Sequence, residues 1–144
     1  MTFGRKLVQL QLVRNALWWL LRVYAYGFHL VLALFLIGIS SIAMTSGKDL
    51  QLGMMPWQGS ILTSATLLLG IVSIVTILMA VTGFVRWLFP LWALIALILM
   101  LRGFFLSPYT FPSAGDFRNA IWLSIAAFVA FLGSLSLFAR RVRR

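Results

Sequence analysis

The sequence contains no cysteine, and this absence excludes several kinds of chemistry at once. Disulfide bonds, thiolate metal sites and catalysis by a nucleophilic thiol all require that side chain. Other reactive groups are scarce too, because Asp49 and Asp116 are the only acidic residues and His29 is the only histidine. Paired acids for glycoside hydrolysis, or a cluster of metal ligands, cannot be built from three such residues on separate segments. We therefore do not expect an enzyme.

Charge is low overall, and nearly all of it is positive. Twelve lysines and arginines against two aspartates give a net charge of +10, yet only 10% of the residues are charged and 62% are hydrophobic. Soluble domains usually contain about 25% charged residues. A chain of 144 residues cannot hide so large an apolar share from water, so we expect lipid around it. The basic residues flank the apolar runs, which favours anionic lipid headgroups over nucleic acid as the partner.

Four apolar runs are each close to the roughly 20 residues that a helix needs to cross about 30 Å of hydrocarbon. An open strand would leave its backbone unpaired in lipid, and the runs lack the alternation of a membrane barrel. The sequence therefore predicts an all-α integral membrane protein with a bundle of four transmembrane helices between residues 27 and 139. The predicted spans are 27–46, 61–85, 88–106 and 117–139.

The basic residues are distributed unevenly between the two sides of this arrangement. Nine of the twelve fall on the side that holds both termini, including the basic tail 140–144, and Lys48, Arg102 and Arg118 fall on the other. Cytoplasmic loops carry the excess of lysine and arginine. We therefore expect both termini in the cytoplasm, and the inner membrane of a bacterium as the location.

Residues 1–26 are predicted to form an amphipathic helix before the first span. On a helix, Gln11, Arg14, Asn15 and Arg22 fall within about 100° of arc, and most of the remaining surface is leucine, valine and aromatic. Such a helix lies in the headgroup layer as an anchor or docks on another membrane protein subunit. The basic stretch is too long for a cleaved signal peptide. The candidate interface residues are Arg14, Trp18, Trp19 and Arg22.

Arg102 is the basic residue that lies deepest within an apolar run. It follows Pro90 by about 12 residues, or roughly 18 Å along a helix, which places it in the outer part of the bilayer. It can extend to the headgroups, pair with Asp116, or contact an anion, a lipid phosphate or a substrate. Arg118 lies at a similar depth. Arg102, Asp116 and Arg118 therefore form a candidate ligand or lipid site, and Asp116 is also a candidate cap for the fourth helix.

His29 lies near the cytoplasmic start of the first span. An imidazole nitrogen can ligate the metal of a haem or chlorin, so a bound haem or pigment is one hypothesis. One histidine supplies only one axial ligand. The other interpretation is an interfacial histidine that only donates or accepts hydrogen bonds.

Small residues recur along one sector of the second and fourth spans and favour close helix packing. The contact is either with another helix of the same bundle or with another protein. Large residues such as Phe35, Trp92, Phe128 and Phe131 are then expected to face lipid or a partner. The candidate packing residues are Gly70, Ser73, Ala127 and Ser134.

Three functions are compatible with these features. The shortage of reactive groups and the docking-type helix favour a non-catalytic accessory or structural subunit of a larger membrane protein complex. A small oligomeric transporter or lipid-handling protein that uses Arg102 is one alternative. A haem- or pigment-binding subunit that uses His29 is the other.

Overall fold

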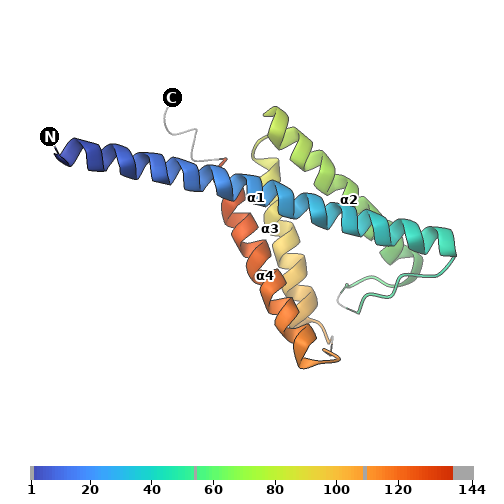
Figure 1. The fold of residues 1–144 in the computed structure, drawn as a ribbon. Coiled ribbons are helices and arrows are strands. Elements are labelled where there is room, and N and C mark those ends of the chain that lie inside the picture. The colour runs from blue at the N-terminus through green and yellow to red at the C-terminus, as the bar shows by residue number, and fades with distance from the viewer. Residues whose placement is uncertain (1, 54, 109, 138–144) are drawn as a thin grey trace.

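The computed structural model describes residues 2–53, 55–108 and 110–137, which form helices and connecting segments but no strand. The helices are α1 (Thr2–Ser46), α2 (Gly59–Thr82), α3 (Leu88–Leu101) and α4 (Ala114–Leu135), and a π-helical turn, η1 (Arg102–Leu106), continues α3 (Figure 1). Four helical segments in this part of the chain are long and apolar enough to cross a membrane. The predicted all-α fold with four membrane-spanning helices is confirmed.

The first helix is longer than the sequence suggested. α1 is one helix of 45 residues, so no break marks the expected boundary between residues 26 and 27. The segment contains no proline, and Gly27, with nothing close to it, stays helical. At 1.5 Å per residue α1 is about 67 Å long, more than twice the thickness of the hydrocarbon core. Its N-terminal half extends well beyond the other helices (Figure 1).

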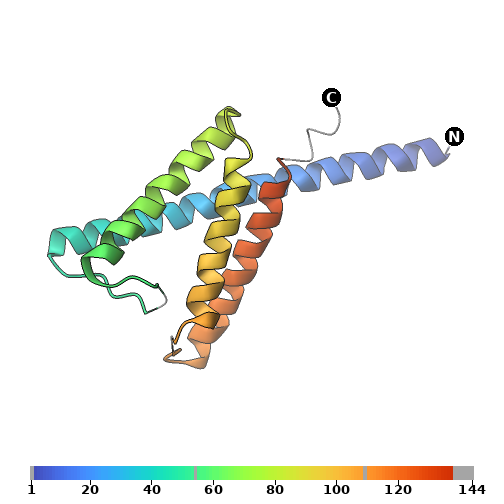
Figure 2. The same cartoon turned by 180° about the vertical axis from the view of Figure 1, so that it is seen from behind.

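Both α2 and α4 pack against α1, and α3 packs between α4 and α2. The antiparallel pair α3 and α4 runs across α1, whereas α2 returns along the C-terminal half of α1 (Figures 1 and 2). The loop between α1 and α2 and the loop between α3 and α4 lie at different corners of the molecule. The helices are therefore not all parallel to one axis, and the two halves diverge towards these loops.

Small residues allow the helix backbones to approach closely. A Cβ atom placed on Gly70 of α2 would lie 2.6 Å from the Ile37 side chain and 3.1 Å from the Ala33 carbonyl oxygen of α1. A Cβ atom on Gly133 of α4 would overlap the carbonyl oxygen of Leu21. Lipid tails are as apolar as the side chains, so helices in a membrane associate through such packing rather than through the hydrophobic effect. These two glycines fix α2 and α4 on α1.

Hydroxyl groups add polar bonds between α1 and α2. The Ser40 and Thr66 hydroxyl oxygens are 2.7 Å apart and both side chains are buried. The Ser73 hydroxyl donates to the His29 carbonyl at 3.3 Å. Bonds of this kind within a membrane contribute about 0.6 kcal/mol each on average. They add to the contact at Gly70 and set the register between the two helices.

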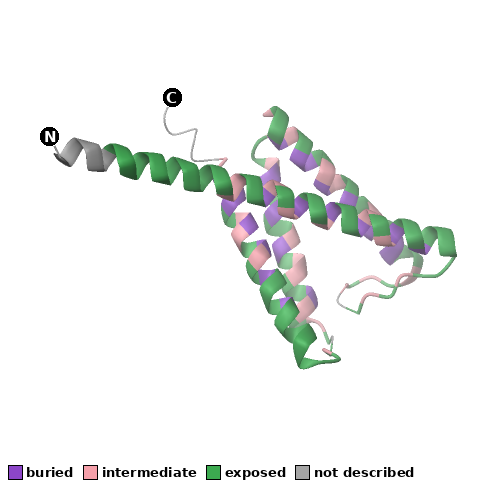
Figure 3. Ribbon diagram, in the orientation of Figure 1, coloured by how far each residue is buried: buried purple, intermediate pink, exposed green. Residues whose placement is uncertain are grey.

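Buried residues form a stripe on each helix where it faces another, and the remaining surface is exposed (Figure 3). The exposed surface is largely apolar, as lipid contact requires. Phe35 and Phe128 are exposed, as expected, and Phe131 is half-buried. The expectation for Trp92 is wrong, because its side chain is only 9% exposed. α3 packs against two helices, which leaves the side that carries Trp92 little access to lipid.

The connection between α2 and α3 covers residues 83–87, whereas the predicted spans left only residues 86–87 between them. α2 ends at Thr82 rather than at residue 85, because Gly83 adopts φ +79° and its amide donates to the Met79 carbonyl. Glycine reaches this left-handed conformation without a steric penalty, which explains the end of the helix. Pro90 lies in the first turn of α3, where a missing amide hydrogen leaves no helical bond unmade.

We predict that Gly133→Ala lowers the thermal stability of the detergent-solubilised protein. The added methyl group meets a backbone carbonyl that cannot rotate away, and overpacking of this kind costs about 1–3 kcal/mol. The matched control is Gly38→Ala in α1, where nothing lies within 4 Å of the added carbon. That variant should be neutral or more stable, since alanine is the better helix former. The loss of helical circular dichroism on heating measures both, and equal midpoints would contradict the close contact.

Candidate functional site

Residues 8–20 of α1 form a bare segment that no other part of the described chain covers. Every residue from 8 to 20 is exposed, including Arg14, Trp18 and Trp19 from the predicted interface. Leu12 is 63% exposed and Trp19 is 60% exposed, although both are large apolar side chains. Arg14 forms no hydrogen bond or ion pair with the described part of the chain. This segment is therefore available to lipid or to another protein.

Arg22, the fourth predicted interface residue, is used within the chain. Its Nε donates to the Ser136 hydroxyl at 3.1 Å, and its Nη2 donates to the Ser136 carbonyl at 2.9 Å. The last carbonyls of a helix have no partner inside the helix, and a cation there is favoured by the helix dipole. Arg22 therefore ties α1 to the C-terminal end of α4, one turn from the contact with Gly133.

A second arginine lies close to the same end of the bundle. The guanidinium groups of Arg22 and Arg86 are both near enough to the half-buried Tyr26 to act on its hydroxyl electrostatically. The Arg86 guanidinium lies over the Gly83 backbone, next to the end of α2. Positive charge therefore gathers where α2 and α4 end. The predicted basic tail 140–144 lies outside the described residues.

His29 is a buried packing residue in this structure. It is 1% exposed, and its Nδ1 donates to the Ala25 carbonyl at 2.9 Å. The ring makes edge contacts with Phe28 and Phe89, at centroid distances of 5.5 and 5.1 Å. The geometry favours a structural histidine over a metal ligand.

The candidate packing residues face the chain's own helices. Gly70 lies against α1, and Ser73 bonds to the His29 carbonyl. Ala127 and Ser134 are buried on the inner side of α4. The intramolecular interpretation of these small residues fits the geometry, and they are not exposed to a second protein.

Arg102 begins the π-helical turn η1 and is exposed. The pair between Arg102 and Asp116, one of the alternatives for Arg102, is not formed. Among the described residues Arg102 and Arg118 have no hydrogen bond or ion pair, and Arg118 is exposed as well. An exposed arginine near the end of a membrane span can extend its charge to the headgroup layer without a protein partner.

Asp116 is held by Ser113 instead. The Ser113 hydroxyl accepts a hydrogen bond from the Asp116 amide at 3.2 Å and donates to the Asp116 carboxylate at 2.7 Å. Ser113 is thus the N-cap of α4, and Asp116 stands in the first turn rather than at the cap. The spacing of serine and acid, three residues apart, is a capping-box pattern that the sequence already contained. It starts the helix at Ala114, earlier than the predicted 117.

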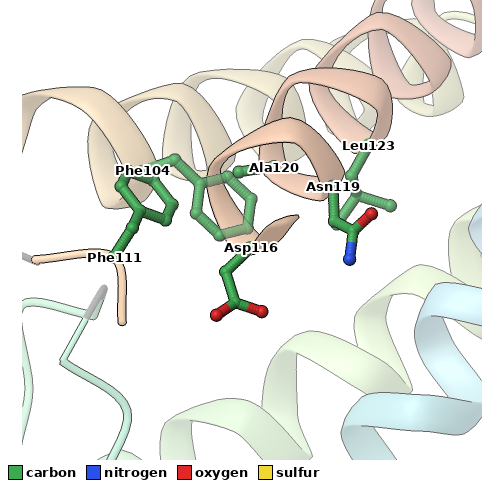
Figure 4. Close-up of a pocket in the computed structure, with 6 residues that line it drawn as sticks. All are labelled: Phe104, Phe111, Asp116, Asn119, Ala120 and Leu123. Atoms are coloured by element: carbon green, nitrogen blue, oxygen red, sulfur yellow. The ribbon is translucent and has the colours of Figure 1, made fainter. Parts of the chain in front are cut away.

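A pocket of about 200 Å³ lies beside Asp116 (Figure 4). Phe104 of η1 and Phe111 of the following loop form an aromatic wall, with ring centroids 6.4 Å apart. Four residues of α4 complete the lining: Asp116, Asn119, Ala120 and Leu123. Asn119, Phe104 and Phe111 were not predicted from the sequence as site residues. The four phenylalanines between residues 104 and 117 already indicated an aromatic cluster in this region. No group of three or more metal-binding side chains occurs in residues 2–53, 55–108 and 110–137.

We predict that Arg22→Ala reduces stability by about 1–2 kcal/mol, because a charged donor and its two hydrogen bonds to the end of α4 are lost. Arg14→Ala is the matched control, since it removes the same charge from the same helix at an exposed position. That change should have an effect within about 0.5 kcal/mol. Unfolding of the detergent-solubilised variants by denaturant measures both. Equal midpoints would mean that the contact with Ser136 contributes nothing.

No protein-family model matches the chain, and neither the curated proteins nor the solved structures give a significant match.

Proposed function

We propose that this chain is a non-catalytic accessory subunit of a larger membrane protein complex, and that the N-terminal half of α1 is its docking element. The observation that carries the proposal is the bare apolar surface of residues 8–20, which extends beyond the bundle on a helix that is continuous with a membrane span. A helix that is apolar over most of its surface and covers nothing in its own chain needs another apolar surface against it.

The width of the apolar surface favours protein over lipid. Gln11, Arg14 and Asn15 fall within about 100° of arc, and the remaining surface of residues 8–20 is apolar except for Gln9 on the opposite side. A helix lying flat in the headgroup layer buries roughly half of its circumference and keeps the other half wet. A partner groove covers the additional arc, and an acidic group on its rim would pair with Arg14.

The attachment of α1 to the bundle also suits assembly. Arg22 and the contact at Gly133 fix the helix to α4 directly after the bare segment. The direction of residues 8–20 is therefore set by the bundle and is not left to a flexible linker. A docking element that is already rigid loses less conformational entropy on binding.

The membrane orientation belongs to the same proposal. We place both termini in the cytoplasm of a bacterium, with anionic headgroups of the inner membrane as counter-charge. The clustering of Arg22 and Arg86 near Tyr26, at the end where α2 and α4 finish, supports a single basic side. Catalytic or transport chemistry would then reside on the partner subunit, since this chain has two carboxylates and one buried histidine.

We predict that a photo-crosslinking amino acid at Leu12 or Trp19 yields a defined protein adduct in intact membranes. The control position is Leu68 on α2, which is 62% exposed but lies on the outer surface of the bundle. It should give lipid adducts or none. Lipid adducts alone at Leu12 and Trp19 would contradict the docking role and favour the anchor. Adducts of the same mass at all three positions would show that the contact is not specific to α1.

We also predict that reporter domains fused to the two termini are both active in the cytoplasm. A reporter inserted in the loop 47–58 should be active only on the other side, because α1 separates the two in this topology. Opposite compartments for the two termini would contradict both the orientation and the four-span arrangement in the membrane.

A further inference from the structure

Asp116 stands out among the ionisable residues of this chain. The sequence has twelve lysines and arginines but only two carboxylates, and one of these two lines the pocket described above (Figure 4). Its neighbours in the pocket are aromatic rings and the Asn119 amide, with no basic residue in the lining. An acid beside aromatic faces is a site for a cation. We propose that this pocket binds the ammonium group of an amine-bearing lipid headgroup, such as that of phosphatidylethanolamine.

The Asp116 carboxylate has capacity for a ligand. One of its oxygens, Oδ2, accepts the Ser113 hydroxyl, and the described residues offer no bond to the other. The side chain points out of the helix into the open side of the pocket, as does Asn119 one turn further along α4 (Figure 4). The amide oxygen of Asn119 is a second acceptor, and no described residue uses it. An ammonium group has three donors, and this pair of acceptors can bind two of them.

The aromatic wall supplies the second part of the recognition. Phe104 and Phe111 are stacked with an interplanar angle of 29°, and Phe117 meets Phe111 at a centroid distance of 5.2 Å. These contacts hold the wall of the pocket in place. A cation over a phenylalanine face is attracted by the ring quadrupole.

The position of the pocket points to lipid as the source of the amine. It lies between the last turn of the α3–η1 span and the first turns of α4, which is where membrane-spanning segments meet the headgroup layer. Ala120 and Leu123 continue the lining along α4 towards the hydrocarbon, so an acyl chain can follow. Arg102 and Arg118, close in sequence to Phe104 and Asp116, are free among the described residues to meet the phosphate.

The net charge of the chain does not predict a preference for an amine-bearing lipid, so a measured preference would come from this pocket. A protein with a net charge of +10 attracts anionic lipid in general. Preference for a zwitterionic amine over an anionic lipid therefore requires a specific site. The experiment uses the full chain, delipidated in mild detergent and given equal amounts of phosphatidylethanolamine and phosphatidylglycerol with identical acyl chains. Native mass spectrometry then counts the lipid that stays bound.

We expect the wild type to retain phosphatidylethanolamine over phosphatidylglycerol, and Asp116→Asn to lower that ratio about fivefold, the effect of one lost ion pair at a surface. Asparagine can still accept the Ser113 hydroxyl bond, and circular dichroism checks that the helices are intact. Phe111→Leu should lower the ratio as well. The matched control is Asp49→Asn, which makes the same charge change at the only other acid and should leave the ratio unchanged.

Two results would overturn the proposal: no preference in the wild type, or an equal loss in the Asp49 and Asp116 variants.

Addition of soluble ethanolamine distinguishes the source of the amine. Displacement of the lipid means that the ammonium group suffices, and retention means that the acyl chains contribute as well. Crosslinking at Leu12 and Trp19 is independent of this site, so failure here leaves the docking proposal standing, and the reverse holds too.

Discussion

The close approach of α1 and α4 at Gly133 is the contact on which the rest of the arrangement depends. Because the environment is as apolar as the side chains, the helices gain little from hiding hydrophobic surface from lipid. They associate where backbones come near enough for dense packing, and a glycine opposite the Leu21 carbonyl permits this. The Arg22 guanidinium then satisfies the free end of α4 within one turn of the same contact. Packing and electrostatics thus act on a single crossing point.

This crossing point determines what the other regions can do. It fixes α1 near its middle, so the C-terminal half packs with α2 through Gly70, Ser40 and Thr66, and residues 8–20 remain uncovered. The α3–α4 pair crosses α1 and carries its loop away from the α1–α2 loop (Figures 1 and 2). The bare segment at one end and the Asp116 pocket at the other both result from this divergence. The two proposed contacts, with a protein and with a lipid headgroup, therefore do not compete for the same surface.

The polar residues follow a consistent division. Most of those in the interior bond to backbone carbonyls or to one another, as Ser40, Thr66 and Ser73 do, and the buried Trp92 indole nitrogen is an exception. Those at the ends either complete a helix terminus, as Arg22 and Ser113 do, or remain exposed, as Arg102 and Arg118 do. Polar groups in lipid must be satisfied locally, so the few that this chain has are mostly structural.

The amino-acid sequence by itself determined the environment, the helical class and the number of spans, because long apolar runs permit no other structure in lipid. It also contained the capping pattern of Ser113 and Asp116, which is a local feature. The tertiary structure alone decided that α1 is continuous, that Trp92 and His29 are buried, and that Arg22 meets Ser136 across more than a hundred residues. It likewise brought Phe104 and Phe111 next to Asp116. The reason is that hydropathy and periodicity describe one helix at a time, whereas burial and pairing depend on which helix faces meet. Lipid tails are as apolar as the side chains, so the faces that pack together do not differ in hydropathy from those that contact lipid.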